Sequence, residues 1–70
     1  MLNAQKTRLR EIAKDLGDVC IIEVAHGIIG DKIQSDLQKE INSLLLSVLG
    51  TNDLPNCTVH EIHTALQPDS

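Results

Sequence analysis

Residues 55–63 read PNCTVHEIH, and the fold expected for the whole chain depends on whether this stretch begins a helix or a strand. As a strand, neither set of alternating side chains would be cleanly apolar, as a half-buried strand requires. As a helix, one face would carry side chains at the spacing i, i+3, i+4 and i+7. Those side chains are Val59, Ile62, His63 and Leu66. The pattern therefore favours a helix.

Signals that begin and end a helix surround the same stretch. Thr58 and Glu61 are spaced as a capping box, in which each side chain bonds the backbone N–H of the other residue. Cys57 and Ile62 are spaced as a hydrophobic staple. Pro68 follows, and proline disfavours helical backbone in the residue before it. These signals predict a short capped helix.

Three glycine junctions divide the chain into four segments. Glycine supplies the left-handed backbone that ends many helices, and Asp, Thr or Asn can cap the helix that follows. The first and third segments carry helical stripes of apolar side chains, and Asp31 or Ser35, in the capping-box pattern SDLQ, is expected to cap the third. The junctions are Gly17-Asp18, Gly30-Asp31 and Gly50-Thr51-Asn52-Asp53.

The second segment, VCIIEVAHGII, is compatible with both kinds of structure. Its β-branched residues favour a strand, whereas Ile22, Ala25 and Ile29 fit a helical stripe. If the last segment is a helix, a strand here would have no partner within the chain, and its backbone groups would stay unpaired. We therefore predict an all-α domain of four helices. Their expected bounds are about 3–16, 19–29, 32–49 and 58–67.

The alternative is an α+β fold with a β-α-β core. If the last segment were a strand, the chain would have strands at about 19–26 and 57–66, separated by the long third segment. The lengths of this strand, helix and strand would resemble those of the tautomerase family, which implies a small tautomerase-like enzyme. The catalytic N-terminal proline of that family is missing, and Cys20 stands near its place.

Length and composition exclude several classes of protein. The 70 residues correspond to one small domain, residues 1–70. No apolar run is long enough to cross a bilayer, and the N-terminus lacks an apolar signal-peptide region. The chain has no Phe, Tyr or Trp on which the bases of single-stranded nucleic acid could stack. We expect a soluble cytoplasmic protein that does not associate with membranes, with Cys20 and Cys57 reduced.

Charge is distributed unevenly along the sequence. Residues 1–16 carry four basic and two acidic side chains, a net of +2, whereas the remainder carries two basic and eight acidic side chains, a net of −6. Binding of nucleic acid by the whole protein is therefore not expected. The basic side chains form either a solvated face or a docking site for an acidic partner. They are Lys6, Arg8, Arg10 and Lys14.

Residues 10–17, REIAKDLG, resemble the first half of a helix-turn-helix motif, with Ile12, Ala13, Leu16 and Gly17 at matching positions. The second half departs from the motif, because the expected recognition helix, VCIIEVAHGII, has no Lys, Arg, Asn or Gln to read base edges. The resemblance implies a transcriptional regulator whose contact with DNA is weak or depends on a partner.

The cysteine and histidines of residues 55–63 also raise the question of a metal or catalytic site. One helix could present only two of Cys57, His60 and His63 on the same side, whereas a structural zinc site usually has four ligands. A nucleophilic cysteine needs a base and a group that orients the base, and the sequence identifies no such set. We therefore predict no metal, no cofactor and no enzymatic activity, and the roles of His60 and His63 stay open.

The third segment carries more apolar surface than one helical stripe requires. A core made of aliphatic side chains in 70 residues is marginal on its own, which favours self-association. We therefore predict a non-enzymatic protein–protein interaction module, a small regulator, adaptor or assembly factor that forms a homodimer through an aliphatic helix face. The side chains expected in that interface are Leu44, Leu45, Leu46, Val48 and Leu49.

Overall fold

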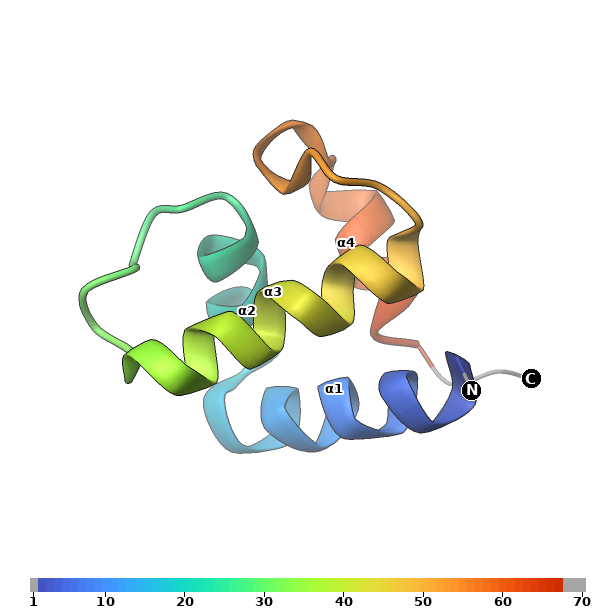
Figure 1. The fold of residues 1–70 in the computed structure, drawn as a ribbon, viewed down its shortest axis with the longest axis horizontal. Coiled ribbons are helices and arrows are strands. Elements are labelled where there is room, and N and C mark those ends of the chain that lie inside the picture. Colours follow the sequence, from blue (N-terminus) through green and yellow to red (C-terminus); the bar gives the residue numbers. More distant parts are fainter. Residues whose placement is uncertain (1, 68–70) are drawn as a thin grey trace.

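The computed structural model describes residues 2–67, and the secondary structure in this range is entirely helical (Figure 1). The predicted all-α fold is confirmed, and the four predicted helices appear in the expected order. A short 3₁₀ helix, η1, that the sequence did not predict precedes the last of them. The elements are α1 (Leu2–Leu16), α2 (Asp18–Ala25), α3 (Ser35–Leu49), η1 (Leu54–Asn56) and α4 (Val59–Ala65).

The long helix α3 holds the fold together, because it packs against α1, α2 and α4. Figure 1 shows α1 and α3 side by side and running in opposite directions. All four α-helices contribute to one buried cluster of aliphatic side chains. The largest side chains in it that are fully buried are Leu9, Ile21, Ile41, Leu45 and Ile62.

The alternative α+β fold is wrong for this chain. The stretch expected to form a first strand, 19–26, lies almost entirely in α2, and the stretch expected to form a second, 57–66, contains α4. The β-branched residues of α2 do not prevent a helix, because Ile21 and Val24 are buried against the other helices. Tertiary burial of this kind overrides the small helix penalty of β-branched residues.

The capping signals at the start of α4 are confirmed. Thr58 is the N-cap residue, and its hydroxyl oxygen accepts a hydrogen bond from the backbone N–H of Glu61 at 3.1 Å. The Glu61 carboxylate accepts in return from the backbone N–H of Thr58 at 3.2 Å. Cys57 and Ile62, the residues of the predicted staple, both belong to the buried cluster. The capping signals therefore act as the sequence indicates, whereas on the predicted apolar face Ile62 and Leu66 are buried and Val59 is 56% exposed.

Helix α2 ends at Ala25, four residues before the predicted end at residue 29. Gly27 has a φ of +74°, and its N–H bonds the carbonyl of Val24 at 3.0 Å. The N–H of Ile28 bonds the carbonyl of Glu23 at 2.9 Å. These two bonds and the left-handed glycine make a Schellman motif, which ends a helix.

Helix α3 begins at Ser35, three residues after the predicted start at residue 32. The N-cap residue is Gln34, which makes no side-chain capping bond, so the predicted cap by Asp31 or Ser35 is wrong. The N–H of Lys32 instead bonds the carbonyl of Ile29 at 3.0 Å within a turn. Residues 26–34 therefore form a long connection of turns and bends between α2 and α3, visible as the wide loop in Figure 1.

Candidate functional site

A groove with a volume of about 290 Å³ opens between the C-terminal end of α2, one side of α3 and the segment at residues 52–55. Figure 1 shows the end of α2 and the segment before α4 above α3, and α1 below it. We call this hollow the α2/α3 groove. It combines a concave shape with apolar side chains, as binding sites in proteins do.

The floor of the α2/α3 groove is part of the hydrophobic core. Val24 and Ala25 come from the last turn of α2, and Leu54 comes from η1. All three side chains are buried, so the floor cannot rearrange without disturbing the core. Leu46 of α3 adds an apolar side chain to the wall and is 37% exposed. A partner in the groove would therefore meet a preformed apolar surface.

The rim of the α2/α3 groove is polar but uncharged. Gln38, Asn42 and Leu46 are four residues apart on α3, a spacing that places them along one side of the helix. Asn52 faces them from the segment that follows α3. No residue that lines the groove carries a charged side chain. Three carboxamides, each both donor and acceptor, thus border an apolar floor.

The hydrogen bond between His26 and Cys57 holds two walls of the groove together. The Nε2 atom of His26, directly after α2, lies 2.6 Å from the carbonyl oxygen of Cys57, directly after η1. The Gln38 side chain also packs closely against Gly30. A Cβ atom added to Gly30 would lie only 3.1 Å from Nε2 of Gln38. The shape of the groove therefore depends on contacts between segments far apart in the sequence.

The structure separates the five side chains that were predicted to form one interface. Leu45 is fully buried within the chain and contributes to the core. Leu44 and Leu49 pack against the core, and Val48 is half-buried. Leu46 alone among the five lines the α2/α3 groove. The reason is geometric, because consecutive helical residues point in different directions around the axis.

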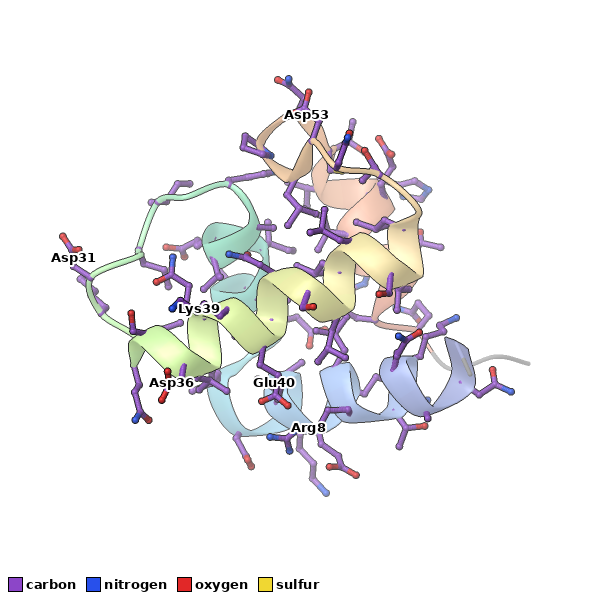
Figure 2. All side chains as sticks on the ribbon, in the orientation of Figure 1. Arg8, Asp31, Asp36, Lys39, Glu40 and Asp53 are labelled. Atoms are coloured by element: carbon purple, nitrogen blue, oxygen red, sulfur yellow. The ribbon has the colours of Figure 1, made fainter. Side chains whose placement is uncertain are left out.

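The predicted basic face is also divided. Arg8 points toward α3, where its Nε and Nη2 atoms each donate a 3.0 Å hydrogen bond to the carboxylate of Glu40 (Figure 2). These bonds raise the pKa of the Arg8 guanidinium and lower the pKa of Glu40. Residues two apart on a helix point to different sides, which places Arg10 away from Arg8. The spacing of four residues aligns the other three basic side chains, Lys6, Arg10 and Lys14, along a separate side of α1.

The helix-turn-helix resemblance is limited to the order of the helices. A single residue, Gly17, separates α1 from α2, whereas the turn of the DNA-binding motif has about three or four residues. The helix in the position of a recognition helix exposes Asp18 and Val19. The carboxylate of Asp18 would repel a phosphate group, and the aliphatic Val19 cannot hydrogen-bond a base edge.

The cysteines and histidines do not converge. Within residues 2–67, no group of three His, Cys, Asp or Glu side chains is placed to hold a metal ion. Both cysteines are free thiols, and burial, with smaller effects from Glu61 and Asp53, raises the pKa of Cys57. The imidazole of His63 lies 3.9 Å from Asp18, and its Nε2 lies 3.1 Å from the Gln67 amide.

Most of the residues that line the α2/α3 groove were not predicted from the sequence to be site residues. The sequence does contain a signal for Gln38 and Asn42. They lie four residues apart in series with Leu46, so they share its side of a helix. No sequence pattern marks His26, Asn52 or Leu54, since only the tertiary fold brings these residues close to the groove.

Comparisons with protein-family models, curated proteins and solved structures found no match for this chain. Within the described residues, no helix combines the length and the apolar character needed to cross a bilayer. The fold and the groove together define a small all-α domain with an apolar, uncharged concavity beside its central helix.

Proposed function

We propose that this chain is a non-enzymatic protein-interaction module that forms a homodimer through the α2/α3 groove. The observation that carries the proposal is the composition of the groove: a buried apolar floor, the partly exposed Leu46 and a rim of carboxamides. Interfaces are stabilised at their centre by apolar contacts that exclude water, and polar groups around them fix the orientation. In this role the chain would serve as a small regulator, adaptor or assembly factor.

The uncharged rim favours a second copy of the chain as the partner. A two-fold interface brings the same surface of both copies together. A group close to the axis therefore meets the identical group of the other copy and must be able to pack or hydrogen-bond with it. Two carboxamides satisfy each other, because each has donors and an acceptor. Two like charges would repel, and the chain has a formal net charge of −4. The groove thus offers an apolar surface without charged side chains on an acidic protein.

The area of the proposed interface can be compared with the accessible surface of the chain. The accessible surface is 4517 Å², and a standard interface covers about 800 Å² per partner, roughly a sixth of this total. The groove must therefore be the centre of a larger contact area. The remainder would come from the surface next to the groove, which includes the exposed Ile28. The proposal places the protein in the cytoplasm, where the free thiols of Cys20 and Cys57 stay reduced.

Sedimentation equilibrium from micromolar to millimolar concentration tests this proposal. We expect the parent protein to dimerise with rising concentration and Leu46→Lys to stay monomeric, because the charge would be desolvated in the apolar groove. Leu16→Lys is the matched control, since Leu16 on α1 is 38% exposed and lies outside the groove. This control should dimerise like the parent. A parent that is monomeric throughout would overturn the proposed function.

A further inference from the structure

Ile28 projects from the protein beside the α2/α3 groove, and the backbone holds it there. It is 66% exposed, among the most exposed large apolar side chains of the chain. Its N–H bonds the carbonyl of Glu23, as the last residue of the Schellman motif that ends α2. The residue before it, Gly27, lines the groove. The chain therefore carries a projecting apolar side chain directly next to an apolar hollow.

The backbone of the motif leaves most of Ile28 exposed. The residue at this place in a Schellman motif frequently makes a hydrophobic contact with the residue whose carbonyl it bonds or with the residue before that one. Here the first of these is Glu23, which offers a carboxylate, and the second is Ile22, which packs against the core. Ile28 is thus held in position by the backbone and is still 66% exposed.

We propose that Ile28 of each copy inserts into the α2/α3 groove of the other, about a two-fold axis that passes close to Gly27. This inference rests on the proposed function and identifies the anchor residue of the dimer. A two-fold axis beside the groove makes two equal contacts at once, because each copy supplies one isoleucine and one groove. An unrelated partner could fill the groove but would also need a second apolar pocket for Ile28.

The local structure also makes Ile28 a suitable anchor. Side chains that dominate binding usually fill a desolvated pocket near the centre of an interface. The Schellman bonds fix the backbone at Gly27 and Ile28 before binding, so little conformational entropy is lost when the contact forms. The groove floor is equally fixed, because Val24, Ala25 and Leu54 are buried in the core. Both halves of the contact are therefore preformed.

A charge-exchange experiment on the full chain tests the reciprocal contact. Ile28→Asp and Leu46→Lys should each raise the dissociation constant of the homodimer by about thirtyfold or more, the effect of losing an interface hot spot. Mixing the two variants in equal amounts should restore a dimer. In that heterodimer, Ile28 of the Leu46→Lys chain enters the intact groove of the other chain. The second contact pairs the two introduced charges, so added salt should weaken it.

Val19→Asp is the control for the Ile28 substitution, because Val19 is 67% exposed on α2 and lies outside the groove. It should dimerise like the parent, and circular dichroism should show the same helicity for all variants. If the parent dimerises and Ile28→Asp dimerises equally, the anchor role of Ile28 is refuted and the proposed function stands. If both variants are monomeric alone and remain so when mixed, the reciprocal contact is refuted. A parent that is monomeric at all concentrations refutes both.

Discussion

The imidazole Nε2 of His26 lies 2.6 Å from the carbonyl oxygen of Cys57, 31 positions later in the sequence. The carbonyl can only accept, so the imidazole donates through Nε2. His26 is the first residue after α2, and Cys57 directly precedes the N-cap of α4. This bond therefore connects the end of one wall of the α2/α3 groove to the segment that forms another.

Removal of the imidazole should destabilise the fold. We expect His26→Ala to lower the free energy of unfolding by about 1–2 kcal/mol, because it leaves a partly buried carbonyl without its donor. Urea denaturation measures the difference. The matched control is His60→Ala, since His60 is exposed on α4 and should change stability by less than about 0.5 kcal/mol. Equal effects of the two substitutions would show that the His26 bond contributes nothing.

The capping box should contribute measurably to the stability of the chain. Thr58→Ala removes the side chain that accepts from the N–H of Glu61, and we expect a loss of about 1 kcal/mol in thermal or urea unfolding. Thr64→Ala serves as the control on the same helix. The Thr64 hydroxyl donates only to the carbonyl of His60 within α4, and alanine is the better helix former. A loss at Thr64 as large as that at Thr58 would contradict the capping role.

Backbone conformation, and not lack of space, should explain the requirement for glycine at position 27. Gly27 has a φ of +74°, and an added Cβ would meet nothing within 4 Å. We expect Gly27→Ala to destabilise by about 1–2 kcal/mol, the penalty of left-handed backbone for a residue with a Cβ. Gly27→Asn should be milder, since asparagine tolerates this conformation better. Equal unfolding free energies for the two variants would refute this explanation.

The bond between Arg8 and Glu40 predicts a dependence on pH. The hydrogen bond from Arg8 lowers the pKa of Glu40, its positive charge adds to this effect, and desolvation opposes it. Because the folded-state pKa is lowered, the stabilisation is present above the ordinary carboxyl pKa and is lost as the pH falls through the lowered value. Carbon-detected NMR titration should show the pKa of Glu40 rising in Arg8→Met.

Arg10→Met is the control for this titration, because Arg10 lies on another side of α1 and its guanidinium contacts Thr7. The pKa of Glu40 should stay at its parent value in that variant. If the pKa of Glu40 responds equally to both arginine substitutions, the shift comes from the general charge of α1 and not from the bond.

Local signals in the sequence were sufficient to predict α1, α3 and the start of α4, whereas α2 was predicted only because a strand there would have no partner within the chain. The Thr58–Glu61 pair predicted the start of α4, and the apolar spacing of α1 and α3 predicted which sides face the core. The boundaries differed where backbone hydrogen bonds decided them. Gly27 lies inside the helix expected at 19–29, whereas its φ of +74° places it in the motif that ends α2.

The candidate site could not be predicted in the same way, because it is a tertiary feature. A run of leucines on α3 predicted an interface, but a step of one residue along the helix sends Leu45 into the core and Leu46 to the groove. The rest of the groove comes from Asn52, Leu54 and the end of α2. The positions of those residues depend on how α2 and η1 pack against α3.

Dilution of the isotope-labelled protein, followed by NMR of the side-chain amides, tests self-association through the groove most directly. Gln38, Asn42 and Asn52 carry NH₂ groups at its rim, and Asn3 on α1 provides a reference outside it. We predict that the three rim signals shift together between micromolar and millimolar concentration while the Asn3 signal stays in place. Rim signals that do not change, or a shift confined to Asn3, would contradict the proposed dimer.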